Sequence, residues 1–147
     1  MSEKKKKKNK KNKQPEKLQV GIDFGTTHTI VALADDGNFP ILNLPFEYKD
    51  ELLTTDRVQT CVAFHDGQML FGPAAHACHL EHYEDGAILI KSIKRLLRDW
   101  HEGQQIKLGE HIIEVDELLT QFLSEIRFAI LRALDIDGTP EIEAVIA

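Results

Sequence analysis

The stretch Gly21-Ile22-Asp23-Phe24-Gly25-Thr26-Thr27 decides the fold of this 147-residue chain. It lies between two mainly apolar segments, 18–23 and 28–34, which predict two strands joined by a tight turn. Such a turn is either an ordinary hairpin with surface threonines or a loop built to hold a ligand. The residue types within it favour the second interpretation.

Acidic, small and hydroxyl-bearing residues follow one another in this turn, which we name the phosphate turn (residues 23–27). Asp23 stands at the end of a strand, where a carboxylate is suited to hold Mg²⁺ directly or through a bound water. Gly25 allows the backbone to approach an anion, and Thr26 and Thr27 add hydroxyl donors beside the backbone N–H groups. Donors for oxygens and a carboxylate for a metal predict a site for a di- or triphosphate with its magnesium.

The phosphate turn is not a P-loop, which requires G-x-x-x-x-G-K-[ST] between a strand and a helix. The stretch closest to that pattern runs from Gly86 to Ser92 and has Ile90 in place of the second glycine. A β-branched residue at that position cannot form the phosphate cradle, so this alternative is rejected.

The segments after the phosphate turn predict an antiparallel meander followed by helices. Strands are expected at 39–44, 58–64 and 68–72, with a polar loop at 45–57 and tight turns at 35–37 and 65–67. Helices are expected at 73–81, 91–100 and 116–134, the last with apolar residues at steps of three and four. A small strand pair is expected around Gly109, and 141–147 predicts the start of a buried strand.

Charge is distributed unevenly along the chain. Residues 1–17 hold nine lysines and two glutamates, a net charge of +7, which leaves −13 for residues 18–147. The segment 1–17 also lacks apolar side chains after Met1, so we expect a disordered Lys-rich tail before a globular domain. The lysines between Lys4 and Lys13 suit weak contact with nucleic acid or an anionic surface, but the absence of aromatic residues favours a solubilising extension.

Composition bears on location and on metal binding. No apolar run approaches the ~20 residues that a membrane helix needs, so no transmembrane segment is expected. Cys61 and Cys78 are too few for a disulfide framework, which favours a reducing cytoplasm. His76, Cys78, His79 and His82 could bind Zn²⁺, but their spacing matches no standard zinc site, and an amphipathic surface helix is the preferred interpretation.

The phosphate turn and the segments after it resemble the DnaK-like, seventy-kilodalton heat-shock chaperone family. The stretch 21–27 is similar to the first phosphate signature of this family and, more loosely, to that of actin and the sugar kinases. Four further segments in the family's order separate the chaperones from the others: Cys61-Val62-Ala63-Phe64, Phe71-Gly72-Pro73-Ala74-Ala75, Ser92-Ile93-Lys94-Arg95-Leu96-Leu97 and Glu143-Ala144-Val145-Ile146-Ala147. The resemblance covers residues 18–147.

This resemblance implies an α/β fold, the actin-like ATPase (ribonuclease H-like) nucleotide-binding domain, in which ATP or ADP with Mg²⁺ lies between two lobes. Residues 18–147 would form an incomplete, N-terminal lobe portion with an antiparallel or mixed sheet plus helices. The implied site residues are Asp23 and Lys94 for catalysis, Asp23 for Mg²⁺ through water, and Gly25, Thr26, Thr27 and His28 for nucleotide contacts. Without the resemblance, Lys94 would be read as one member of a solvated basic helix face.

Several positions depart from the family pattern. His28 stands where the family usually has Tyr or Asn, Gln59 where it commonly has Pro, and Arg98 where it often has Gly. These departures indicate a divergent relative. The sequence also contains no second phosphate signature, adenosine segment or peptide-binding domain of the family, so we expect an N-terminal fragment that is a weak or inactive ATPase alone.

Three functions therefore stay open. The leading hypothesis is an ATP-hydrolysing molecular chaperone of the stress response, whose partners would be client polypeptides and co-chaperones. The second is another kinase of the actin-like superfamily, which the lysine–arginine segment disfavours. The third is a non-catalytic nucleotide-binding scaffold tethered by its basic tail.

Overall fold

The computed structural model describes residues 17–147, so the tail predicted from the sequence lies almost entirely outside the described residues, as does its predicted contact with nucleic acid. Lys17, placed in the tail by the sequence, is the first residue of a strand. The strands are β1 (Lys17–Phe24), β2 (His28–Leu33), β3 (Leu44–Tyr48), β4 (Glu51–Thr55), β5 (Val58–Gln59), β6 (Val62–His65), β7 (Gln68–Phe71), β8 (Ile88–Ile90), β9 (Gln105–Leu108), β10 (His111–Glu114) and β11 (Glu141–Ile146). The helices are α1 (Gly72–His82), α2 (Val115–Ala133) and a 3₁₀ helix, Lys94–Leu97.

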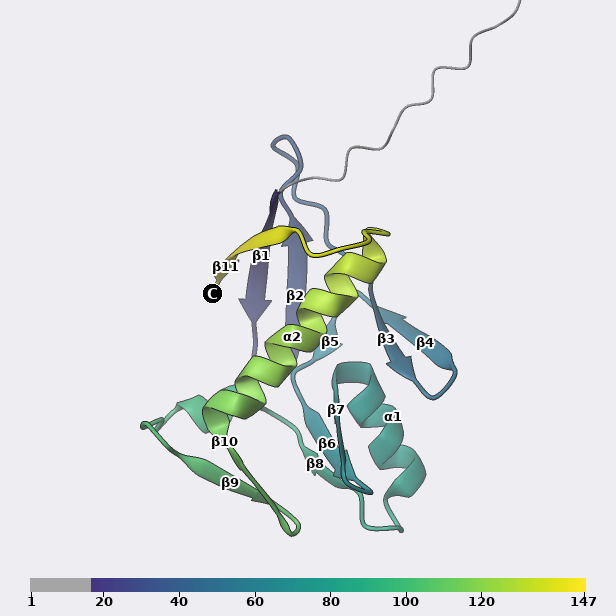
Figure 1. Cartoon of the computed structure of the whole chain (residues 1–147), viewed down its shortest axis with the longest axis vertical. Coiled ribbons are helices and arrows are strands. Elements are labelled where there is room, and N and C mark those ends of the chain that lie inside the picture. The colour runs from purple at the N-terminus through teal and green to yellow at the C-terminus, as the bar shows by residue number, and fades with distance from the viewer. Residues whose placement is uncertain (1–16) are drawn as a thin grey trace, which may run out of the picture.

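A four-stranded sheet in the order β11-β1-β2-β5 carries the phosphate turn. β1 is antiparallel to β2 and parallel to β11, so the sheet is mixed. Burial alternates along β1, because its even-numbered side chains face the core while Gln19, Gly21 and Asp23 face outward. α2 runs diagonally across this sheet (Figure 1) and covers its inner face. Asp23 is exposed on the opposite, outer face of β1.

Three smaller sheets surround α1 and α2. β6 lies between β7 and β8, and α1 packs against β6. The hairpin β3–β4 contacts both α1 and α2, and the hairpin β9–β10 leads directly into α2. The structure is thus a mixed α/β arrangement with more strand than helix.

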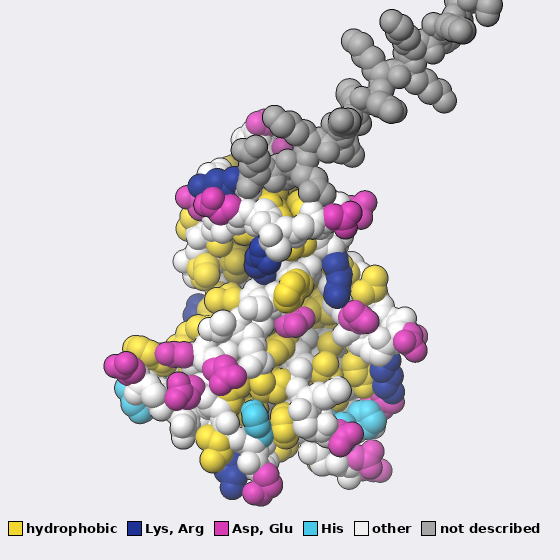
Figure 2. All heavy atoms as spheres, viewed as in Figure 1, with side chains coloured by type: hydrophobic (Ala, Val, Ile, Leu, Met, Phe, Trp, Pro, Cys, Tyr) yellow, Lys and Arg dark blue, Asp and Glu magenta, His cyan; other side chains and the backbone are white. Residues whose placement is uncertain are grey.

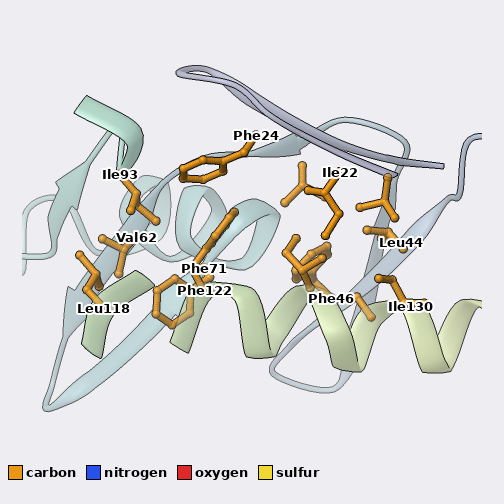
Figure 3. Close-up of a cluster of buried hydrophobic side chains, with 14 of the residues drawn as sticks. Ile22, Phe24, Leu44, Phe46, Val62, Phe71, Ile93, Leu118, Phe122 and Ile130 are labelled. Carbon is orange, nitrogen blue, oxygen red and sulfur yellow. The ribbon is translucent and has the colours of Figure 1, made fainter. Parts of the chain in front are cut away.

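One hydrophobic core joins the sheets to α2. Phe122 is fully buried on α2, with its ring centroid 5.9 Å from that of Phe24 and 6.1 Å from that of Phe71. Figure 3 shows Phe24 pointing from the sheet toward these two rings, with Ile93 beside it. The backbone beneath the phosphate turn is therefore anchored by the largest apolar cluster of the described residues.

Several predictions from the sequence are confirmed. Residues 36, 37, 66 and 67 all have positive φ, as the predicted turns at 35–37 and 65–67 require. Pro73 lies in the first turn of α1, the strand pair surrounds Gly109, and α2 begins one residue before its predicted start. Its apolar stripe faces the core, with Phe122, Ile126 and Ile130 buried.

The predicted polar loop at 45–57 is wrong, because these residues form most of the hairpin β3–β4. Leu44 and Phe46 alternate into the core against α2, and Lys49 adopts a φ of 55° at the turn. The expected strand at 39–44 is reduced to a single bridge between Ala32 and Ile41, and β8 was not predicted at all. Segments this short contain too few residues to show a period.

Three further elements differ from expectation. The helix expected at 91–100 is reduced to the 3₁₀ helix, and the Ile93 N–H just before it donates to the carbonyl oxygen of Thr60, 3.0 Å away, in the segment between β5 and β6. β11 forms as expected, yet Val145 and Ile146 are exposed rather than buried. Strand 58–64 is also interrupted at Thr60 and Cys61.

Candidate functional site

The phosphate turn is closed by one short backbone hydrogen bond. The Gly25 N–H donates to the carbonyl oxygen of His28 at 3.0 Å. A Cβ atom at position 25 would lie 2.3 Å from that same oxygen, closer than side-chain carbons approach in folded proteins. The tight closure therefore requires glycine for a steric reason that the sequence did not indicate, and it leaves the backbone at Gly25 uncovered by a side chain.

The strand end that carries Asp23 is held from both sides. Asp23 lies opposite Ile30 of β2, and the Phe24 N–H donates to the carbonyl oxygen of Ala147 at 2.9 Å. The Ala147 N–H in turn donates to the Ile22 carbonyl oxygen at 2.9 Å. The backbone at Asp23 is thus braced by neighbouring strands, while its side chain is exposed.

The polar side chains of the turn are exposed and have no side-chain partners within residues 17–147. Asp23, Thr26, Thr27 and His28 are all exposed. Within residues 17–147 none of them makes a side-chain hydrogen bond or an ion pair. A carboxylate and two hydroxyls beside an uncovered backbone form a surface that could receive an oxyanion and a hydrated cation.

Lys94 is brought to the same place by the 3₁₀ helix. Its ammonium nitrogen lies 5.8 Å from the centroid of the Phe24 ring, so it stands beside the residue that separates Asp23 from Gly25. Lys94 is half-buried and forms no ion pair within the described part of the chain. Lys94 thus lies against the buried ring of Phe24, whereas the Asp23 side chain faces outward from the same strand.

Thr60 joins these two parts of the site, and the sequence did not identify it. The Thr60 N–H donates to the Thr27 carbonyl oxygen at 3.0 Å, and the Thr60 carbonyl oxygen accepts from the Ile93 N–H at 3.0 Å. Its hydroxyl lies 2.8 Å from the hydroxyl of Thr29, and both side chains are fully buried. A threonine within the apolar run 58–64 was the only signal that could have marked it.

Two buried polar atoms next to this connection have no hydrogen-bond partner within residues 17–147. They are Gln59 Oε1 and Ser92 Oγ, from the residues that precede Thr60 and Ile93. Gln59 is also the cross-strand neighbour of His28. Both atoms are enclosed by the surrounding protein, so they depart from the usual pairing of buried polar atoms without being open to a group at the surface of the turn.

The histidines and cysteine at 76–82 do not converge. Cys78 is buried on the inner side of α1 and His76 is exposed. The His79 ring meets Tyr83 edge-on, with centroids 5.5 Å apart, whereas His82 stacks on His65 at 4.3 Å. Among the described residues no group of three or more His, Cys, Asp or Glu side chains is arranged to hold a metal ion.

Residues 18–147 carry a net charge of −13. Figure 2 shows acidic side chains spread over the visible face, with fewer Lys and Arg side chains between them. No helix within residues 17–147 has the length and apolar character to cross a membrane.

No protein-family model matches this chain, and no curated protein matches it either. The resemblance to the DnaK-like chaperones therefore stays a prediction from the sequence.

Proposed function

We propose that this chain binds ATP or ADP with Mg²⁺ at the phosphate turn, as the phosphate-holding part of a DnaK-like chaperone ATPase. The observation that carries the proposal is the position of the Lys94 ammonium nitrogen, 5.8 Å from the ring centroid of Phe24, which is itself a residue of the phosphate turn. Nothing in the local sequence links Lys94 to the turn, whereas the ATPase resemblance requires the two to meet.

The residues present fit a magnesium nucleotide. Asp23 would hold the hydrated metal, because Mg²⁺ keeps most of its waters and needs only one or two carboxylates together with phosphate oxygens. The backbone at Gly25 and the hydroxyls of Thr26 and Thr27 would bind phosphate oxygens. Lys94 would bind the terminal phosphate and neutralise the charge that develops on it, which is the main requirement of phosphoryl transfer.

The wider chaperone function belongs to the same proposal. The resemblance, rather than the geometry of residues 17–147, extends it to client polypeptides and co-chaperones. A cytoplasmic location agrees with the two cysteines, Cys61 and Cys78, both of which are free thiols.

A second function, nucleotide binding without turnover, is favoured by one observation. Asp23, Thr26 and Thr27 are all exposed, so a bound phosphate would keep contact with water on one side. Fast hydrolysis depends on excluding solvent and on preorganised charge around the transferred group. A scaffold and an ATPase would share the nucleotide-binding site and differ in the rate at which the bound ATP is hydrolysed.

Binding is tested on the 147-residue chain by recording ¹H–¹⁵N spectra during titration with millimolar Mg·ATP. We expect shifts at the amides of Gly25, Thr26 and Thr27 and at Lys94. Removing magnesium, or changing Asp23 to Asn, should weaken them. Spectra unchanged at these amides by Mg·ATP and Mg·ADP would contradict the proposal. A single-turnover assay with the same chain then separates an ATPase from a scaffold.

A further inference from the structure

Two hydroxyl groups are buried beneath the phosphate turn and bond to each other. Thr29 Oγ1 and Thr60 Oγ1 lie 2.8 Å apart, and both side chains have 0% exposure. Apart from the cysteines, they are the only polar residues within 17–147 that are buried as a whole. Burying a hydroxyl without a partner is costly, so each threonine makes the burial of the other possible.

The Thr60 backbone connects two segments that are far apart in the sequence. Its N–H donates to Thr27 at the end of the phosphate turn, and its carbonyl oxygen accepts from Ile93, the residue before Lys94. Thr60 lies between β5 and β6 and belongs to neither strand. Its two backbone hydrogen bonds, to Thr27 and from Ile93, are therefore not part of the regular pairing of β5 with β2 or of β6 with β8. One residue therefore links the turn, through Thr27, to the segment that carries Lys94.

We propose that Thr60 is a positioning residue that sets the distance between the phosphate turn and Lys94, and that the buried hydroxyl pair with Thr29 holds it in place. Thr29 is the second residue of β2, and Thr27 directly precedes that strand. The hydroxyl–hydroxyl bond to Thr29 and the backbone bond to Thr27 therefore both attach Thr60 to the start of β2. Ile93 is fully buried and supports the opposite side. This inference rests on the proposed nucleotide-binding function, and it adds a residue that would not touch the nucleotide.

The role proposed for Thr60 concerns the geometry of the site rather than the stability of the fold. A catalytic side chain must be held close to its productive distance from the reacting atoms. A displacement of about 1 Å can reduce the reaction rate roughly a hundredfold. A valine at position 60 has nearly the shape of threonine but leaves the Thr29 hydroxyl buried without a partner. Thr29 and Thr60 would then separate or admit water, and the Thr27–Thr60–Ile93 connection would shift.

The test compares Thr60→Val with Thr60→Ser, which keeps the hydroxyl, in the full 147-residue chain. Mg·ATP titrations are followed at the amides of Thr26 and Lys94, and single-turnover hydrolysis is measured where the wild-type chain shows it. We expect Thr60→Val to retain the response at Thr26 and to lose the response at Lys94. Any hydrolysis should slow roughly ten- to a hundredfold at unchanged Mg·ATP affinity. Thr60→Ser should behave as wild type.

Two controls make the result decisive. If Thr60→Val does not fold, the double variant Thr29→Val with Thr60→Val replaces it, because it buries no unpaired hydroxyl. In a Lys94→Ala background, Thr60→Val should cause no further loss of hydrolysis. A folded valine variant whose Lys94 response equals that of wild type overturns the inference alone. A wild-type chain without a magnesium-dependent response overturns the proposed function first, before any Thr60 variant is compared.

Discussion

The ammonium nitrogen of Lys94 lies 5.8 Å from the centre of the Phe24 ring, next to the strand end that carries Asp23. A cation over an aromatic face gains attraction from the ring, so Phe24 both fills the core and provides a surface on which Lys94 rests. The core beneath Phe24 therefore contributes directly to the position of a proposed catalytic side chain.

Replacing Lys94 with Ala is expected to slow ATP hydrolysis while leaving Mg·ATP binding largely intact. Removing one preorganised group that stabilises the charge on the transferred phosphoryl group lowers the rate roughly a hundredfold or more. Single-turnover assays and titration calorimetry on the same protein measure the two quantities. Lys91→Ala is the matched control, because Lys91 is exposed in the same segment. Equal rates for wild type and Lys94→Ala would remove Lys94 from the mechanism.

Replacing Gly25 with Ala should distort the phosphate turn. The new Cβ would lie 2.3 Å from the His28 carbonyl oxygen, so the closing hydrogen bond must lengthen or break. Overpacking of this kind costs about 1–3 kcal/mol of unfolding free energy, which urea denaturation measures. Gly21→Ala is the control on the same strand, because no atom lies within 4 Å of its added Cβ. Equal losses from the two alanines would show that the contact at Gly25 is not limiting.

Replacing Phe122 with Ala should remove the centre of the core. Its ring is fully buried against Phe24 and Phe71, and such a truncation typically costs about 3–5 kcal/mol. Phe128, on the same helix, has 51% exposure, so Phe128→Ala should cost far less. Thermal and urea unfolding of the two variants provide the comparison. Similar stability losses would contradict the packing of α2 against the sheet.

Stability should fall in acid partly through the carboxylate of Glu81, which ties α1 to the hairpin β3–β4. Hydrogen bonds from Lys49 and from the Tyr48 hydroxyl, the latter at 2.6 Å, lower the pKa of Glu81 below its ordinary value of 4.5. A lowered pKa means that the folded state favours the charged form. The contribution is therefore present above pH 4.5 and is lost as the pH falls through the lower, folded-state value.

Urea midpoints at neutral pH and below pH 4.5 should show this for Glu81→Gln. The variant should be less stable than wild type at neutral pH, and the difference should shrink in acid. Glu84→Gln is the control, because Glu84 is exposed just beyond α1 and forms no ion pair within residues 17–147. A difference between wild type and Glu81→Gln that stays constant with pH would rule out the ionic contribution.

Elements with a clear period or a strong turn were predictable from the sequence. The steps of three and four in α2 and the positive-φ residues at Asp36, Gly37, Asp66 and Gly67 are local features, and the structure retains them. The hairpin β3–β4 and the 3₁₀ helix were not predictable, because contacts with α2 and with Thr60 decide their form. Short polar segments carry little intrinsic preference, so tertiary contacts override it.

The candidate site divides in the same way. Asp23, Gly25, Thr26 and Thr27 adjoin one another in the chain, so their chemistry and the tight bend that displays them could be read from residue types alone. The meeting of Lys94 with Phe24, the Thr29–Thr60 hydroxyl pair and the place of β11 beside β1 depend on distant segments packing around Phe122. Local steric preferences act between neighbours and are encoded residue by residue, whereas burial of a shared core selects one arrangement only once the whole chain has collapsed.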